Sequence, residues 1–256
     1  MIAEGAYGTF EGAAADQVVF GAYQREGTWS PELVALLGRL VQTRGSFVDV
    51  GAHIGLVAIP VAERSGCACL AVEPEPGNFA LLQRNIARHG LNARVHAIHG
   101  AAHYTAGRVC LALSRDNSGD HHVLASAPTD RATVEVPAAR LDDWVAAHEL
   151  PEPFVVKLDT QGAEVAVLRG APHTLQRASH LVVEYWPAGL RRQGESAEAL
   201  ASLLQTMPFG AVLGPRFDGR LVTRAQVFES LAWIPDDGSD EGFFDVLLSR
   251  EPTLPR

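Results

Sequence analysis

The chain has 256 residues, of which 47% are hydrophobic and 20% charged, with a formal net charge of −9. This composition fits a globular α/β protein, and the absence of a run of about eighteen apolar residues predicts no membrane-spanning helix. The acidic balance disfavours a nucleic-acid partner, so we expect a small-molecule acceptor substrate.

The cysteines and the N-terminus both favour a cytoplasmic protein that does not bind a membrane. Cys67, Cys69 and Cys110 are best explained as buried thiols in a reducing compartment, rather than as zinc ligands or a disulfide. Residues 1–5 lack the basic region and apolar core of a signal peptide. We leave the oligomeric state open.

Residues 1–45 are expected to form an N-terminal lid or helical segment, and residues 46–256 the main domain. Residues 7–20 mix glycine, alanine and single aromatics and predict irregular structure. A helix is expected from Ser30-Pro31-Glu32, with Ser30 as its N-cap, because apolar residues then recur at helical spacing as far as Val41.

The stretch from Phe47 to Gly55 predicts a buried strand, a glycine loop and a helix whose apolar spacing starts at Ile54. Such a loop brings backbone N–H groups and a helix N-terminus to a nucleotide-like ligand. Gly51 and Gly55 have GxxxG rather than GxGxxG spacing. This spacing suits a nucleoside without a pyrophosphate, of which S-adenosylmethionine (SAM) is the commonest, although a structural turn that binds nothing has the same pattern.

A second strand over residues 69–72 ends at Glu73 and Pro74, where an acid can accept the hydroxyls of a ribose. The next helix is expected to be capped by Asn78 and to end at Gly90. A third strand over residues 94–99 then leads to Gly100 and Ala101.

Residues 107–113 and 133–136 alternate as a pair of antiparallel strands does. The polar loop between them, residues 114–122, ends in His121 and His122 and is either a binding loop or a solvated turn.

Residues 154–159 form an apolar strand interrupted by Lys157 and ending in Asp159, after a short helix at 141–148. Residues 160–164 turn directly into another helix. The strand at 180–184 also ends in an acid, Glu184. Ligands of open α/β sheets bind beyond the carboxyl ends of the strands, where these acids would lie. A helix at 196–207 and strands at 211–213, 221–222 and 243–248 complete the predicted elements.

Several of these segments together resemble the FkbM family of SAM-dependent methyltransferases. The matching segments are Phe47-Val48-Asp49-Val50-Gly51-Ala52-His53-Ile54-Gly55, Glu73-Pro74-Glu75-Pro76-Gly77-Asn78-Phe79 with Asn85, Leu141-Asp142-Asp143-Trp144, Val156-Lys157-Leu158-Asp159-Thr160-Gln161-Gly162-Ala163-Glu164 with Leu168-Arg169-Gly170-Ala171, and Val183-Glu184. The Lys-x-Asp-x-x-Gly-x-Glu pattern is the most specific of them. His53 stands where the family more often has Asn, which puts in doubt only a side-chain contact in the loop.

The resemblance implies an α/β fold of the class I methyltransferase type: a Rossmann-like open sheet with helices on both faces, mostly parallel with an antiparallel last strand. It also implies SAM as methyl donor and O-methylation of a hydroxyl on a sugar or a natural-product intermediate. By position, the glycines would cradle the methionine part of SAM, Glu73 would take the ribose, and residues 100–101 would border the adenine. The expected cofactor-binding residues are Asp49, Gly51, Ala52, His53, Gly55, Glu73, Pro74, Asn78, Gly100, Ala101 and Asp159.

The expected catalytic residues are Asp159, Lys157, Glu184, His121 and His122. Either Asp159 and Glu184 hold a magnesium ion that acidifies the acceptor, or a metal-free site uses His121, His122 or Lys157 as base. The metal-free form is favoured, because Asp159 at a strand–helix junction can serve to orient the loop. A non-catalytic SAM- or nucleotide-binding module would have no use for the strand-end acids, and an oxidoreductase would need the missing GxGxxG loop.

Overall fold

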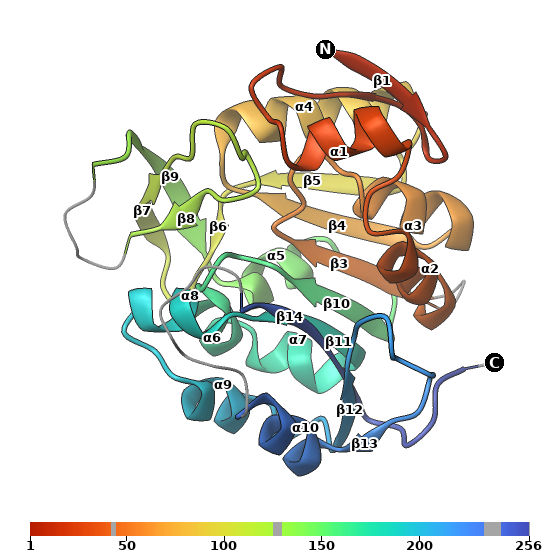
Figure 1. The fold of residues 1–256 in the computed structure, drawn as a ribbon, viewed down its shortest axis with the longest axis vertical. Coiled ribbons are helices and arrows are strands. Elements are labelled where there is room, and N and C mark those ends of the chain that lie inside the picture. The colour runs from red at the N-terminus through yellow and green to blue at the C-terminus, as the bar shows by residue number, and fades with distance from the viewer. Residues whose placement is uncertain (42–44, 125–129, 233–241, 256) are drawn as a thin grey trace.

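The computed structural model describes residues 1–41, 45–124, 130–232 and 242–255 (Figure 1). The strands are β1 Ile2–Gly5, β2 Gly8–Glu11, β3 Ser46–Val50, β4 Ala68–Glu73, β5 Val95–His99, β6 Ala101–Ala102, β7 Gly107–Ala112, β8 His122–Val123, β9 Thr133–Ala139, β10 Phe154–Leu158, β11 Ala178–Tyr185, β12 Phe209–Val212, β13 Val222–Thr223 and β14 Phe244–Ser249. The helices are α1 Val19–Glu26, α2 Pro31–Leu40, α3 Ala58–Ser65, α4 Pro76–Arg88, α5 Leu141–Ala147, α6 Glu164–Arg169, α7 Pro172–Arg177, α8 Pro187–Arg192, α9 Ala197–Leu203 and α10 Arg224–Leu231.

An 8-stranded sheet in the order β13-β12-β14-β11-β10-β3-β4-β5 forms the centre of the molecule. Strands β5, β4, β3, β10 and β11 are parallel, and the last strand, β14, lies antiparallel between β11 and β12. This topology confirms the predicted class I, Rossmann-like open sheet. No helix within the described ranges is both long and apolar enough to cross a bilayer.

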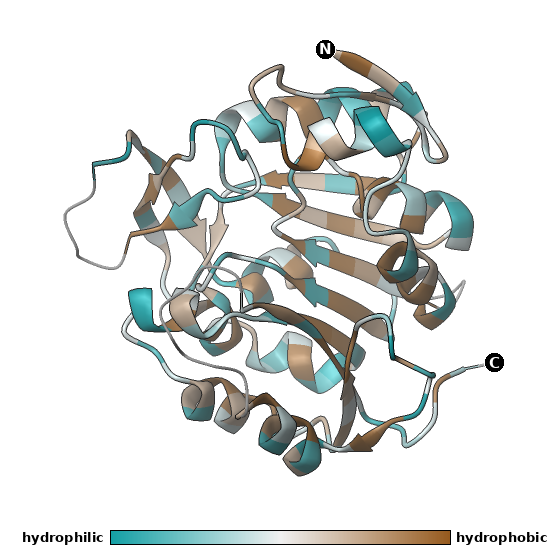
Figure 2. Ribbon diagram, in the orientation of Figure 1, coloured by the Kyte–Doolittle hydropathy of each residue, from teal (hydrophilic) through white to brown (hydrophobic). Residues whose placement is uncertain are grey.

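The central strands are buried on both faces, which explains why they appear as nearly continuous hydrophobic ribbons in Figure 2. Successive side chains of a strand point to opposite faces. Phe47 therefore packs with α1, α2, α3 and α4 in one core, and Val48 packs with α5, α6, α7, α9 and α10 in the other. Because these strands are parallel, their carboxyl ends lie at the same edge of the sheet, and the polar residues there are brought together.

A 4-stranded sheet in the order β6-β9-β7-β8 lies beside the main sheet, at the left of Figure 1. Antiparallel pairing of β7 with β9 confirms the predicted ribbon. The polar loop that joins β7 to β8 extends from this small sheet toward the carboxyl ends of β3 and β4, where it meets the glycine loop.

The N-terminal segment is more regular than expected. Strands β1 and β2 pair as an antiparallel hairpin and α1 follows, where the sequence predicted irregular structure over residues 7–20. Tyr7, Phe10, Phe20 and Tyr23 are all buried in the core that contains α3 and α4. Tertiary packing of these aromatics therefore stabilises a regular structure that the glycine-rich sequence alone does not indicate.

Three predicted helix starts need correction. Ser30 precedes α2 as expected but caps nothing, because its φ of 45° places it in the left-handed region. The helix expected from Ile54 begins at Ala58, since the residues before it form the turn of the glycine loop. Asn78 lies inside α4, and the cap is Glu75, whose carboxylate accepts the Asn78 N–H at 2.6 Å.

Candidate functional site

A cavity of about 670 Å³ opens at the carboxyl ends of the parallel strands. Glu73 at the end of β4 and Asp159 after β10 both line it, so the two acids lie on the same edge of the sheet. One end is bordered by Pro74, Gly100 and Ala101. The other end is formed by Asp159 after β10, Glu184 near the end of β11 and Asp245 near the start of β14, so one space joins the glycine loop to these acids.

The glycine loop is held tightly against the end of β10. Gly51 has a φ of +85°, and a Cβ at this position would lie 1.9 Å from the backbone oxygen of Asp159, so no side chain can be accommodated. His53 also has a positive φ, 53°, and its backbone N–H donates to Glu73 Oε2 at 2.9 Å. The loop therefore fixes the Glu73 carboxylate as well as its own backbone.

Glu73 is buried, and its other oxygen accepts the Glu75 N–H at 2.9 Å. Burial raises the pKa of Glu73 to about 7, although the two backbone N–H groups act in the opposite direction. Each carboxylate oxygen has a second lone pair, so the carboxylate can still accept hydroxyl groups from the cavity.

Lys157 lies buried between two carboxylates. Its Nζ is 3.4 Å from Asp49 Oδ1 and 3.3 Å from Asp159 Oδ2. Burial raises the pKa of Asp49 to about 6. Burial also tends to lower the pKa of Lys157, but the carboxylates of Asp159, Asp49 and Asp245 outweigh it and hold this pKa above its usual value. Lys157 is therefore a fixed cation at neutral pH.

Gln161 links two of the acids, since its Nε2 donates to Asp159 Oδ1 at 2.9 Å and to Glu184 Oε2 at 3.1 Å. Its φ of 55° bends the chain back toward the cavity. Burial raises the pKa of Glu184 well above its usual value, and the neighbouring carboxylates Asp159, Glu164 and Asp245 raise it further. The Glu184 carboxyl therefore holds its proton more firmly than an exposed glutamate does.

Asp245 on β14 stands directly opposite Glu184 on β11 in the antiparallel register, and both line the cavity. Burial and then the charge of Asp159 raise the pKa of Asp245 to about 6, while Lys157 lowers it. The acids from β10, β11 and β14 therefore gather around one lysine at this end of the cavity.

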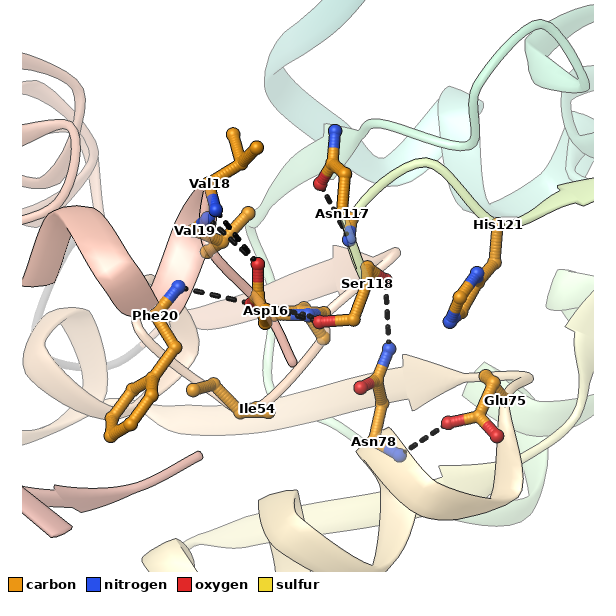
Figure 3. A network of polar contacts seen from close by, with 12 residues as sticks. Asp16, Val18, Val19, Phe20, Ile54, Glu75, Asn78, Asn117, Ser118 and His121 are labelled. Atoms are coloured by element: carbon orange, nitrogen blue, oxygen red, sulfur yellow. Dashed lines mark hydrogen bonds and ion pairs between the residues drawn. The ribbon is translucent and has the colours of Figure 1, made fainter. Parts of the chain in front are cut away.

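The loop after β7 closes against the glycine loop and the N-terminal segment (Figure 3). The Ser118 hydroxyl donates to Asp16 Oδ2 at 2.8 Å, so its oxygen accepts from His53 Nε2 at 2.6 Å. The Asn78 amide donates to the Ser118 backbone oxygen at 3.0 Å. Asp16 also accepts the N–H groups of residues 18–20 at the start of α1.

The two histidines of this loop differ in position. His121 lines the cavity, and its Nδ1 accepts the Ser114 N–H at 2.9 Å, which leaves its proton on Nε2. His122 is buried beside Arg131 and is not among the residues that line the cavity. Burial lowers the pKa of both rings.

Most of the predicted site residues meet at this cavity. Those that line it are Asp49, Gly51, Ala52, His53, Glu73, Pro74, Gly100, Ala101, His121, Lys157, Asp159 and Glu184. Gly55, Asn78 and His122 do not line it. Gly55 instead packs against Ile59 and Leu82, where a Cβ would be too close. Within the described residues, no group of three or more His, Cys, Asp or Glu is arranged to hold a metal ion.

Sequence reasoning missed Asp16, Ser118, Gln161 and Asp245 as site residues. The first two lie far apart in the chain and meet only through tertiary packing. Gln161 belongs to the matching motif, and the position of a carboxamide between two acids could have pointed to it. Asp245 carries no local signal beyond its position at the start of the last strand.

The Methyltransferase FkbM domain matches residues 49–209. The chain belongs to this family. The family match covers the glycine loop, the Glu73 strand end and the acids of β10 and β11, whereas Asp245 lies beyond it.

AglP of Haloferax volcanii, a hexuronic acid methyltransferase, is 26% identical to the chain over 136 residues, which are 53% of the chain and 54% of AglP. The chain thus spans about half the length of the curated relative it matches. The methyltransferase FkbM of Methylobacillus flagellatus has a solved structure that matches with a TM-score of 0.48 and 15% identity, over 81% of this chain and 44% of that one. A geranyl diphosphate methyltransferase in complex with SAM matches with a TM-score of 0.47 and 12% identity, over 91% and 89% of the two chains.

Proposed function

We propose that this FkbM family member is a SAM-dependent O-methyltransferase that methylates a hydroxyl group of a small molecule. The observation that carries the proposal is the shared cavity, in which the glycine loop and Glu73 lie together with the buried acids Asp159 and Glu184. Its volume of about 670 Å³ lies within the ordinary range for a bound small molecule. A passive nucleotide-binding module would not need charged groups buried at the far end.

The residues present fit the cofactor. Glu73 offers free lone pairs to two ribose hydroxyls, and Gly51, which lines the cavity, lets the loop pack against the backbone of Asp159. Gly100 and Ala101 would border the adenine, and the backbone of Ala52 and His53 the methionine part. When bound, SAM supplies an electrophilic methyl group on a positively charged sulfur.

The acceptor would lie at the end formed by Lys157, Asp159 and Glu184. Gln161 and Lys157 hold the two carboxylates in place, so these acids can orient a hydroxyl by hydrogen bonds. We prefer the metal-free form of the reaction, because the carboxylate oxygens of Asp159 already have protein donors. Activity that is lost with EDTA and restored by magnesium would overturn this preference.

The proposed class of acceptor rests on the similarity to AglP and on the net charge of the chain. AglP is a hexuronic acid methyltransferase, which supports a sugar derivative as the acceptor of this chain. A hydroxyl on a natural-product intermediate in a cytoplasmic biosynthetic pathway fits the same site. The net charge of −9 disfavours a nucleic-acid acceptor.

Calorimetric titration with SAM, S-adenosylhomocysteine and NADH tests the cofactor assignment. We expect both adenosyl compounds to bind and NADH not to bind. Glu73→Ala should weaken both by about 1.5–3 kcal/mol, the value of a hydrogen bond to a charged group. Glu135→Ala, which removes an exposed carboxylate on β9, is the matched control and should bind as the wild type does. Binding of NADH alone would instead support an oxidoreductase.

Transfer of a radiolabelled methyl group from SAM to a panel of free sugars, uronic acids and phenols tests the reaction. We expect a methyl ether with at least one member, identified by mass spectrometry. SAM binding without transfer to any hydroxyl compound in such a panel would favour the non-catalytic module.

A further inference from the structure

Four carboxylates occupy the acceptor end of the cavity, and three of them are held by protein groups. Lys157 lies between Asp49 and Asp159, and Gln161 donates to Asp159 and Glu184. Within the described part of the chain, no hydrogen bond reaches the Asp245 carboxylate. The charges of Lys157 and Asp159 act on Asp245 through space, and the charge of Asp245 acts in the same way on Glu184.

The other candidate bases are each unsuited to taking a proton. Lys157 is already protonated between its two carboxylates. His121 uses its unprotonated nitrogen to accept the Ser114 N–H, so it could gain a proton only by breaking that bond. His122 does not line the cavity.

The neighbouring acids are also unsuited, for different reasons. Asp159 already accepts from Lys157 and Gln161, and a base held by two donors is a weak one. Glu184 is more deeply buried than Asp245 and faces it directly across the strand pair. Two carboxylates in such a position favour one shared negative charge, which resides on the more exposed partner.

We propose that Asp245 is the general base of the methyl transfer, with Glu184 directly opposite it on β11 as its partner. This inference rests on the proposed function and adds to it a residue outside the family match. Asp245 would take the proton of the acceptor hydroxyl while an oxygen lone pair forms the bond to the methyl carbon. The carbon–sulfur bond breaks with its electron pair remaining on sulfur, giving a methyl ether and S-adenosylhomocysteine. Asp245 then releases the proton to solvent.

The ionisation of Asp245 depends on the charged groups around it. Lys157 and Asp159 face it from β10 and the loop that follows, and Glu184 faces it from β11. On the other side lie Val212 of β12 and Leu213 directly after it, which carry no charge. A cation bound in the cavity in front of Asp245 should therefore favour its ionised form, whereas an uncharged analogue should not.

SAM and S-adenosylhomocysteine differ in charge, because only SAM carries a positive charge on sulfur. Their dissociation constants should be measured by calorimetry from pH 5 to pH 7.5 for the wild type and Asp245→Asn. We expect the preference for SAM over S-adenosylhomocysteine to rise about tenfold across this range in the wild type, as a unit charge at close range in a partly buried site predicts. In Asp245→Asn the rise should be much smaller, because only the carboxylates that remain, such as Asp49, still titrate in this range. Effects of Glu73 cancel in the ratio, because both ligands carry the same ribose.

Carbon NMR of the wild-type chain labelled at aspartate carboxyls provides a second readout that needs no folded variant at the site. The Asp245 signal should titrate near pH 6 without ligand, shift down by about one pH unit with SAM, and shift little with S-adenosylhomocysteine. The exposed Asp143 is the internal control and should respond to neither ligand. Equal shifts with the two ligands, or a constant preference in the wild type, would overturn the assignment of Asp245. Failure of both ligands to bind would refute the proposed function instead.

Discussion

Lys157 determines the charge balance of the site at the scale of single residues. It is buried with Asp49, whose two carboxylate oxygens find no hydrogen-bond donor within the described residues. A buried ion pair adds little net stability compared with apolar residues, but removal of one partner leaves the other charge without compensation. The cost of that removal should therefore depend on whether Asp49 can take up a proton.

Lys157→Met is expected to lower the free energy of unfolding by about 3–5 kcal/mol at pH 8 and by much less at pH 5. The pKa of Asp49 is raised to about 6 even beside Lys157, and loss of the lysine raises it further. The folded variant then keeps a proton that the unfolded chain loses above about pH 4, so its stability falls as the pH rises. Urea denaturation at the two pH values measures the difference.

Arg108→Met is the matched control, because it removes one partner of an exposed ion pair with Glu135. Exposed pairs contribute about 0–1 kcal/mol, so this variant should resemble the wild type at both pH values. A cost for Lys157→Met that is equally large at pH 5 and pH 8 would contradict the role of Asp49.

The sequence reveals those site residues that stand at the ends of parallel strands of the main sheet. Glu73, Asp159 and Glu184 could be predicted to meet, because parallel strands of one open sheet end on the same edge. Asp245 was missed although an antiparallel last strand was expected over residues 243–248, because such a strand brings its first residues, not its last, to that edge. Asp16 was also beyond reach, because its partner Ser118 belongs to another sheet and their contact depends on packing.

At the scale of elements, the loop after β7 connects three parts of the chain by hydrogen bonds. Ser118 contacts His53 of the glycine loop, Asp16 before α1, and Asn78 of α4. The Gln17 N–H also donates to the Asp116 backbone oxygen at 3.0 Å. The loop and the segment that it contacts both line the cavity, which predicts a link between loop opening and ligand release.

Ser118→Ala removes the hydroxyl bonds to His53 and Asp16 and should accelerate SAM release about fivefold. The factor corresponds to about 1 kcal/mol, the typical net value of one hydrogen bond. Stopped-flow dissociation and amide hydrogen exchange of residues 114–124 measure the two effects, and exchange should become faster in the variant.

Ser202→Ala is the control for this change, since the Ser202 hydroxyl only donates to the Ala199 backbone oxygen on the exposed face of α9. It should change neither rate. If Ser118→Ala also left both rates unchanged, the loop would not control access to the cavity.

Strands of the main sheet could be predicted closely because apolar runs bounded by turns leave little choice of structure. The hairpin β1–β2 and α1 could not, because glycine and alanine give no clear periodicity and the aromatics are spaced irregularly. Asn78 has the right residue type for a helix cap, but α4 already begins at Pro76, so the N-cap is Glu75, three residues before Asn78. The local sequence pattern is therefore sufficient to predict the strands of the main sheet, whereas the structure of the N-terminal segment depends on tertiary packing.

At the scale of the whole molecule, the N-terminal segment shares its core with the sheet. Phe10 and Phe20 are fully buried among side chains of α3 and α4. Asn85 on α4 forms the polar part of the same junction, donating to the backbone oxygens of Glu11 and Ile54 at 2.9 Å and accepting the Glu11 N–H at 2.8 Å. We therefore propose that residues 1–45 serve as a lid whose base is built into the main domain.

Asn85→Asp tests that junction with almost no change of shape. The amide donors are replaced by a carboxylate that faces two backbone oxygens, so either a buried charge is opposed by like partial charges or a proton must be taken up. The free energy of unfolding at pH 8 should fall by about 3 kcal/mol or more, measured by urea denaturation, and the pKa of the new acid should rise.

Asn92→Asp makes the same chemical change at an exposed position after α4 and should alter stability by no more than about 0.5 kcal/mol. A lid base that belongs to the domain predicts that Asn85→Asp also weakens SAM binding, because Ile54 lies in the glycine loop and loses its donor. If stability fell but SAM affinity stayed at the wild-type value, the N-terminal segment would be attached to the domain without supporting the loop. If neither changed, the three hydrogen bonds of Asn85 would not connect these elements in solution, and the lid would have to be held by the aromatic core alone.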